Sequence, residues 1–95
     1  RSAALPDVPT LKEIGVNVVA DAYFGVYGPA NMANDRVQKI SDAVAQALNA
    51  PDMQARIRGF GLVPNYANAQ ALTASQAAHL KRWEAPIKAS GYTAE

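Results

Sequence analysis

An almost uninterrupted apolar run over residues 16–27 most constrains what this chain can fold into. The run is rich in β-branched and aromatic side chains, namely Val16, Val18, Val19, Tyr23, Phe24, Val26 and Tyr27. Such side chains favour strands. Apolar character that continues instead of alternating is typical of a strand covered on both faces, as in an α/β sheet. The pattern therefore predicts a buried strand over Val16–Tyr27, ended by Gly28-Pro29.

A second strand is predicted over Leu62–Tyr66, where Pro64 restricts it to a sheet edge because proline lacks an amide donor. Two or three strands do not make a complete sheet. The chain has 95 residues, of which 49% are hydrophobic and 18% charged, and this composition is typical of a folded protein. It also begins Arg1-Ser2-Ala3 without a methionine. We therefore expect these residues to be a piece of a longer chain.

Helical patterns occupy the rest of the sequence. A short helix is predicted over Pro9–Ile14, closed by Gly15, since glycine adopts the left-handed conformation of a helix end easily. Asn34 or Asp35 is expected to cap a second helix. The apolar face of that helix follows a 3.6-residue spacing and consists of Val37, Ile40, Val44, Ala47 and Leu48.

Two further helices follow. Pro51 is expected in the first turn of one, whose inward residues are Met53 and Ile57 and which stops at Gly59 and Gly61. Asn68 is expected to cap the last helix, which ends at Gly91 and is kinked by the internal Pro86. One face of this helix carries Leu72, Gln76, Leu80, Trp83 and Ile87, which are apolar except for Gln76. The predicted order is loop–α–β–α–α–β–α, an α/β arrangement.

Composition excludes several classes of function. The formal net charge of +1 gives no electrostatic reason to expect binding to nucleic acid. Without cysteine, neither a disulfide nor a thiolate zinc site can form. His79 is the only histidine and is interpreted as a partly solvated surface residue, with a pH-switch role as the alternative. No serine lies in a Gly-x-Ser-x-Gly elbow. We therefore expect no enzymatic activity, no metal and no cofactor.

Tyr23, Phe24 and Gly25 form the most interesting segment. Two aromatic residues beside a glycine near the end of a strand can line a cleft, and the glycine would let a ligand approach the backbone closely. The alternative is plain packing of aromatic rings in the core. Because neighbours on a strand point to opposite faces, Tyr23 and Phe24 are expected to differ in role, one in the core and the other toward the cleft or hinge.

Three stretches together resemble the receptors of tripartite tricarboxylate transporters, also called the Bug family. Residues 4–15, Ala-Leu-Pro-Asp-Val-Pro-Thr-Leu-Lys-Glu-Ile-Gly, are similar to the family's LPDVPT stretch with its following Glu and Gly. Residues 23–30 resemble its aromatic-aromatic-Gly-x-x-x-Pro-Ala. Residues 47–52, with Gly61 and Trp83, resemble its helix break, glycine and late tryptophan. The chain departs where the family usually has Gly-Thr-Pro, here residues 31–33, where it commonly has tryptophan, here Tyr23, and at the unusual Pro86.

The resemblance implies the C-terminal portion of a two-lobed periplasmic-binding-protein (type II) fold that closes on a small carboxylate. Residues 1–15 would end one lobe, residues 16–28 would form a hinge-crossing strand, and residues 29–95 would supply helices and an edge strand packing on the other lobe. Such receptors hold the carboxylate largely with backbone amides and waters of the N-terminal part, an arrangement that needs no metal. The resemblance further implies a periplasmic location, membrane transporter subunits as partners, and Tyr23, Phe24 and Gly25 beside the ligand.

A self-standing interaction module is the alternative interpretation. The predicted strand over residues 16–27 is too apolar to lie at an exposed edge, where unpaired amides and carbonyls invite another chain. We expect the isolated chain to self-associate, most simply as a two-fold homodimer that pairs or swaps this strand. A partly unfolded, aggregation-prone monomer is the other expected outcome.

Overall fold

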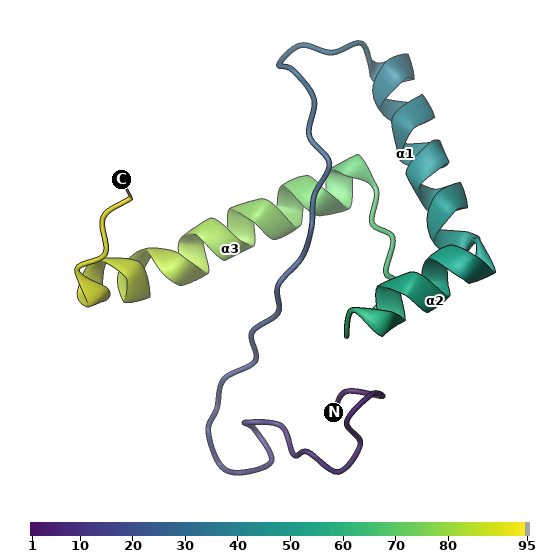
Figure 1. The fold of residues 1–95 in the computed structure, drawn as a ribbon. Helices are drawn as coiled ribbons and strands as arrows, with labels where there is room; N and C mark the ends of the chain where they lie inside the picture. The colour runs from purple at the N-terminus through teal and green to yellow at the C-terminus, as the bar shows by residue number, and fades with distance from the viewer. Residues whose placement is uncertain (95) are drawn as a thin grey trace.

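The computed structural model describes residues 1–94, and its regular secondary structure is helical. In these residues the helices are α1 (Asn34–Asn49), α2 (Pro51–Gly59) and α3 (Ala69–Ser90). Figure 1 shows α1 and α2 joined at a sharp corner, with α3 running across at one side and a long non-helical segment passing over it. The predicted α/β order is not observed, since no strand forms within residues 1–94.

The segment predicted as the buried strand, Val16–Tyr27, is extended but unpaired. The prediction of a strand here is wrong for this chain by itself, and the reason is hydrogen bonding. A strand needs a neighbour that supplies a ladder of amides and carbonyls, whereas a helix makes those bonds within itself. The second predicted strand, Leu62–Tyr66, likewise forms an irregular connection between α2 and α3. The two segments do not pair with each other, so the sheet is absent from the described residues.

Helix α1 begins differently from the prediction. Ala33 is its N-cap and no side chain caps it, so the expected capping by Asn34 or Asp35 is wrong. Asp35 instead lies in the first turn, where its negative charge interacts favourably with the helix dipole. Before this helix, Asn31 has a φ of 61°, in the left-handed region. Asparagine tolerates that conformation better than most residues, so the turn before α1 forms here without a glycine.

The starts of α2 and α3 are as predicted. Pro51 occupies the first turn of α2, where its missing amide would have had no partner in any case. The side chain of Asn68 caps α3 by accepting a 2.9 Å hydrogen bond from the amide of Ala71. Gly91, with a φ of 71°, ends α3 in the left-handed conformation. Pro86 lies inside α3, which continues to Ser90.

The predicted helix over Pro9–Ile14 is a single helical turn closed at both ends. Thr10 and Glu13 form a capping box, since the Thr10 amide donates to Glu13 Oε2 at 2.7 Å and the Glu13 amide donates to Thr10 Oγ1 at 3.2 Å. At the other end Gly15 has a φ of 89°. The amides of Gly15 and Val16 donate to the carbonyls of Lys12 and Leu11, which is a Schellman motif. Thr10, Glu13 and Gly15 therefore hold this turn by local bonds.

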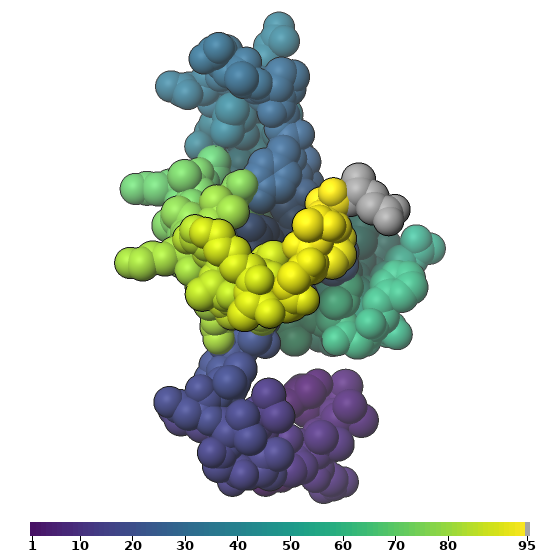
Figure 2. All heavy atoms as spheres, turned by 90° about the vertical axis from the view of Figure 1, so that its left-hand side faces the viewer, coloured from purple at the N-terminus to yellow at the C-terminus, as the bar shows by residue number. Residues whose placement is uncertain are grey.

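The chain covers little of its own surface. No residue among those described is buried. The accessible surface is 8358 Å², roughly 3,000 Å² more than the ~5,300 Å² expected for a folded monomer of this mass. The radius of gyration is 16.7 Å, against about 12 Å for a compact domain of this length. Figure 2 shows the N-terminal residues as a block below the helices, joined to them by a narrow neck.

Candidate functional site

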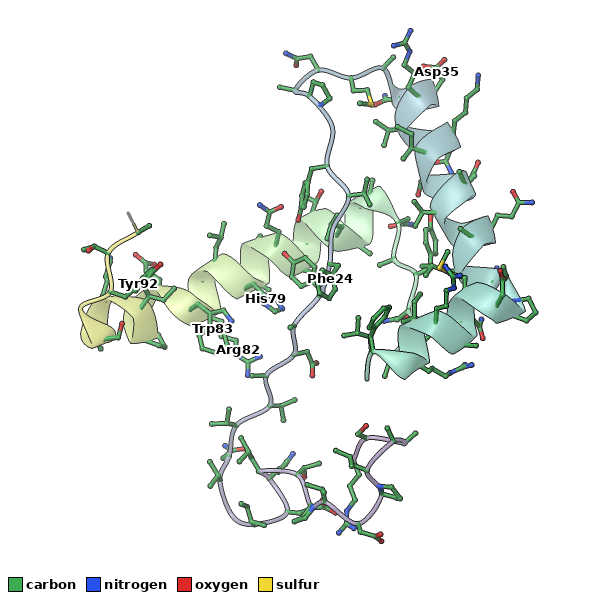
Figure 3. The ribbon with its side chains drawn as sticks, in the orientation of Figure 1. Phe24, Asp35, His79, Arg82, Trp83 and Tyr92 are labelled. Carbon is green, nitrogen blue, oxygen red and sulfur yellow. The ribbon has the colours of Figure 1, made fainter. Side chains whose placement is uncertain are left out.

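The segment that carries the predicted ligand-binding residues crosses α3 and contacts it through Tyr23 (Figure 1). The rings of Tyr23 and His79 meet edge to face, with centroids 5.1 Å apart and planes at 82°. Such T-shaped contacts are a favoured geometry for aromatic rings. His79 lies on the same side of α3 as Arg82 and Trp83 (Figure 3). The sequence placed His79 on the surface, and it is half-buried, but its contact with Tyr23 was not predicted.

A groove runs along α3 from this contact. Tyr23 lines it at one side, and its apolar lining from α3 includes Leu80, Trp83 and Ile87. Charged residues also line it, among them Glu84 and Lys88, whose side chains form a 2.7 Å ion pair. This pair is largely exposed and contributes little to stability. The groove thus presents the predicted apolar face of the last helix without a covering element.

Tyr23 and Phe24 differ strongly in their surroundings. Tyr23 packs on His79 and is 41% exposed, whereas Phe24 is 85% exposed. The difference follows from the extended backbone, which turns neighbouring side chains to opposite sides. Phe24 thus presents nearly its whole ring to solvent beside the crossing of α3.

Gly25 is explained by its own neighbour in the chain. A Cβ at this position would lie 2.6 Å from Cε2 of Tyr27 and 2.9 Å from its Cζ and Oη. The space that the missing side chain leaves is therefore filled by the Tyr27 ring. The sequence had suggested that a ligand approaches the backbone at Gly25, and Tyr27 was not among the predicted site residues. The two-residue spacing of 25 and 27 was the available signal, because it places both residues on one side of an extended segment.

The Tyr23 side chain also influences Tyr27. The neighbouring phenol of Tyr23 raises the pKa of Tyr27, because it favours the neutral form of that side chain. The rings of Tyr23 and His79, hereafter the aromatic cluster, form the contact between the extended segment and α3.

A second, smaller hollow lies at the N-terminal turn. Residues 10–12 line it together with residues 18–21, which include Asp21. Beside it, the Arg1 guanidinium donates to both oxygens of Glu13 at 3.0 Å. A hydrogen bond from the backbone of Thr10, and then one from the Arg1 side chain, hold the pKa of Glu13 below its ordinary value. The signature residues Thr10 and Glu13 are thus engaged in holding their own turn.

The part of the chain that the structure describes shows neither a metal site nor a membrane-spanning helix. Across residues 1–94, no three His, Asp or Glu side chains gather closely enough to hold a metal ion. None of the helices α1–α3 is both long enough and apolar enough to cross a membrane. The site is therefore the crossing of the extended segment over α3, with the aromatic cluster at its centre.

Comparison with known proteins identifies the relatives of this chain. Residues 1–92 match the family described as tripartite tricarboxylate transporter family receptors. A protein of Cupriavidus necator, described as "UPF0065 protein in gbd 5'region", is 35% identical over 91 residues. That alignment covers 96% of this chain and 28% of the relative, so the chain spans little more than a quarter of the relative's length. No solved structure matches the chain.

The family resemblance seen in the motifs at residues 4–15 and 23–30 is thereby confirmed over nearly the whole sequence. With residues 1–92 matched, the chain belongs to the tripartite tricarboxylate transporter family of receptors, which are extracytoplasmic solute-binding proteins of the periplasmic-binding-protein fold.

Proposed function

We propose that these residues act as the C-terminal part of a periplasmic receptor that captures a small carboxylate and delivers it to the membrane subunits of a tripartite tricarboxylate-type transporter. The observation that carries the proposal is the family match over residues 1–92. The activity needs no chemical step, only capture and release of the ligand. Residues 1–15 end one lobe, residues 16–28 cross the hinge, and residues 29–95 pack on the other lobe.

The exposed surface supports the view that these residues belong to a larger receptor. The chain exposes roughly 3,000 Å² beyond the expectation for a folded monomer of its mass. The groove along α3 leaves Trp83 and Ile87 40% and 47% exposed. We propose that the remainder of the receptor covers the groove along α3 and pairs with the extended segment, which would restore the missing strand.

We place Tyr23, Phe24 and Gly25 at the ligand cleft, with Phe24 as the direct contact. The exposure of Phe24 supports this assignment, since a ring that is 85% exposed is free to contact a bound molecule. Tyr23 supports the cleft wall through its contact with His79. A cleft of this kind buries most of a small ligand between two walls. Amides and waters of the remaining receptor would hold the carboxylate itself.

The test is calorimetry on the whole receptor that carries these residues, with a panel of mono-, di- and tricarboxylates and their uncharged amide analogues. We expect one class of carboxylate to bind and its amide analogue to fail. Phe24→Ala should weaken binding about tenfold, the equivalent of ~1.4 kcal/mol. Phe60→Ala is the matched control, because Phe60 is also an exposed phenylalanine, 80% exposed, but follows α2 instead of lying in the crossing segment. Equal binding by both variants would remove Phe24 from the site, and absence of any carboxylate binding would refute the function.

Self-association is the second candidate function, and the same exposed surface favours it. The excess area exceeds the ~800 Å² per partner of an ordinary protein interface. Sedimentation of the whole receptor distinguishes the two functions. A monomer that binds carboxylate supports the receptor, and a stable dimer without small-molecule binding supports the interaction module.

A further inference from the structure

We infer that His79 is a positioning residue of the receptor, whose ring holds Tyr23 on α3 and thereby sets the direction of the neighbouring Phe24. The effect on the ligand rests on the proposed function, whereas the ring contact itself does not depend on that function. The sequence analysis placed His79 on the surface and gave it no partner.

The extended segment is fastened to α3 by a contact between two rings. The centroids of Tyr23 and His79 lie 5.1 Å apart and their planes meet at 82°. One ring therefore presents its edge, which carries positive partial charge, to the negative face of the other. Within residues 1–94, no hydrogen bond joins residues 16–33 to residues 69–90. The ring pair is thus the directional contact that places the segment on the helix.

The segment covers His79 and leaves the adjacent apolar residue open. His79 is half-buried, whereas Leu80 is 68% exposed. If burial of apolar area alone placed the segment, the leucine would be covered first, because its burial is the more favourable. The segment instead lies where a ring of α3 can meet Tyr23 edge to face. This difference indicates that the ring contact determines where the segment crosses.

Helix α3 gives the His79 ring a fixed place. Gln76 lies three residues before His79 and Trp83 four residues after it, and these spacings put all three on one face of the helix. The same three residues line the groove together with Tyr23. Figure 3 shows His79 and Trp83 on one side of α3. A segment that lacks a strand partner therefore rests on a ring that a regular helix carries.

The position of Tyr23 determines the direction of Phe24. Adjacent residues of an extended backbone turn their side chains to opposite sides. Tyr23 is held against α3, and Phe24 is 85% exposed. Loss of the His79 ring would free the segment to turn about its own axis, and Phe24 would turn with it. His79 would then affect the ligand through Tyr23 and the shared backbone, without touching the ligand.

A mutant cycle in the whole receptor tests this role. His79→Ala removes the ring, and His79→Phe replaces it with another flat ring that can make the same edge-to-face contact. Each is made alone and together with Tyr23→Leu, which removes the partner ring and keeps an apolar side chain. Gln76→Ala is the matched control, because Gln76 lines the same groove one turn earlier without a ring contact.

Three measurements are made for each variant. Calorimetry uses the carboxylate that the wild-type receptor binds best, and urea unfolding gives the stability. Nuclear magnetic resonance records the imidazole protons of His79, which are identified by their absence from His79→Phe. Because an aromatic ring shifts the resonances of protons close to it, these signals report whether Tyr23 lies against His79 in the receptor.

We expect His79→Ala to raise the carboxylate dissociation constant about fivefold, the size of effect typical of one aromatic pair. His79→Phe should stay within about twofold of wild type. In the Tyr23→Leu background, His79→Ala should have less than about a twofold further effect, since contacting residues are coupled. Tyr23→Leu should move the imidazole resonances of His79, a change that general loosening elsewhere would not produce. Gln76→Ala should leave affinity and resonances near wild type.

Equal losses of affinity in His79→Ala and His79→Phe would overturn the inference, because a ring would then not suffice at position 79. Independent effects of His79→Ala and Tyr23→Leu would also overturn it, as would imidazole resonances that Tyr23→Leu leaves unchanged. Coupling in unfolding without coupling in affinity would refute the effect on Phe24. If the wild-type receptor binds none of the carboxylates, the proposed function fails, while the resonances and the unfolding cycle still decide whether His79 holds the segment.

Discussion

Residues 1–33 and residues 34–90 differ in where their backbone hydrogen bonds are made. The second region consists largely of helices α1, α2 and α3, whose amides find partners within a turn of themselves. The first region has two hydrogen-bonded turns over residues 2–8, a capped turn over residues 10–15, and then an extended segment without a ladder partner. The difference shows that this sequence encodes its helices through local bonds, whereas the segment predicted as a strand has no partner within the described residues.

Side-chain packing shows the same dependence in both regions. The helices form without a covered core, and no residue among those described is buried. Helices of this length owe most of their stability in proteins to packing of an apolar face. The comparison therefore predicts that the two regions will respond differently when the surroundings of the chain are removed or restored.

The largest expected effect is the loss of binding and cooperativity when the 95 residues are isolated. One wall of a two-sided cleft cannot bury a small ligand, so we expect no measurable carboxylate binding by the isolated chain. We also expect self-association, or a partly unfolded monomer that retains helical circular dichroism. Calorimetry and sedimentation at micromolar concentration check both. A compact monomer with cooperative unfolding would break the comparison, because it would mean that the extended segment needs no partner.

Trp83 tests whether the groove along α3 is covered in the whole receptor. Trp83→Ala should destabilise the receptor by about 3 kcal/mol, the lower end of the range for removing a buried tryptophan. In the isolated chain Trp83 is 40% exposed. The same substitution should therefore change the helical circular dichroism of the isolated chain only slightly. Urea unfolding of the receptor and circular dichroism of the isolated chain measure the two effects. A similar small effect in both settings would show that nothing covers the groove.

Predictions from the sequence were more often right for residues 34–90 than for residues 1–33. Pro51, Asn68 and Gly91 mark helix ends where the sequence predicted them, because each acts through bonds within its own helix. The capping of α1 was predicted wrongly, since Ala33 leaves its first turn without a side-chain cap. The strand predicted over Val16–Tyr27 does not form in the described residues, because a strand needs a neighbouring ladder that the local sequence does not provide. Its composition predicts burial on both faces but does not supply the neighbours.

The candidate site was predictable in part for similar reasons. The family was identified from motifs in residues 4–15 and 23–30, and the match over residues 1–92 confirms it. Spacing in an extended segment was sufficient to expect Tyr23 and Phe24 on opposite sides. The two-residue spacing places residues 25 and 27 on one side of the segment. It does not predict that the Tyr27 ring turns back over Gly25.

Asn31 tests the junction between the two regions. Its φ of 61° lies where most side chains are strained. Asn31→Val should destabilise the receptor by about 1–2 kcal/mol, because a β-branched residue fits the left-handed conformation poorly. Asn31→Gly is the matched control and should be close to neutral, since glycine adopts this conformation freely. Urea denaturation gives both values, and equal stability of the two variants would show that the turn is not held in this conformation.

Substitutions at the N-terminal ends of α1 and α3 test which of the two helices depends on a side-chain cap. Asn68→Ala removes the acceptor of the Ala71 amide and should destabilise the receptor by about 1 kcal/mol. Asn34→Ala should change stability by much less, because Asn34 makes no capping bond at the start of α1. Thermal or urea unfolding of the two alanine variants provides the measurement. A larger loss from Asn34→Ala would mean that the capping first predicted from the sequence forms in the receptor.

The smallest expected effect is the pH response of the turn over residues 10–15, which is capped at both ends. The hydrogen bonds from Thr10 and Arg1 lower the pKa of Glu13 in the folded turn. Because the folded pKa lies below the unfolded one, the stabilisation is fully present above the unfolded pKa and is lost as the pH falls through the folded value. Glu13 is exposed, so water and salt screen the interaction and the change should be slight.

Nuclear magnetic resonance of the Thr10 and Glu13 amides between neutral pH and about pH 3 detects the response, since the interval spans the ordinary titration of a glutamate. The two amide signals should shift together at a pH below the ordinary glutamate value, and Glu13→Gln should abolish the shift. Asp7 is the control carboxylate, because it belongs to the same N-terminal block but forms no side-chain hydrogen bond among the described residues. If the Thr10 amide titrates in Glu13→Gln as it does in the wild type, the capping box does not hold this turn. The self-sufficiency of residues 10–15 would then depend on the Schellman motif at Gly15 alone.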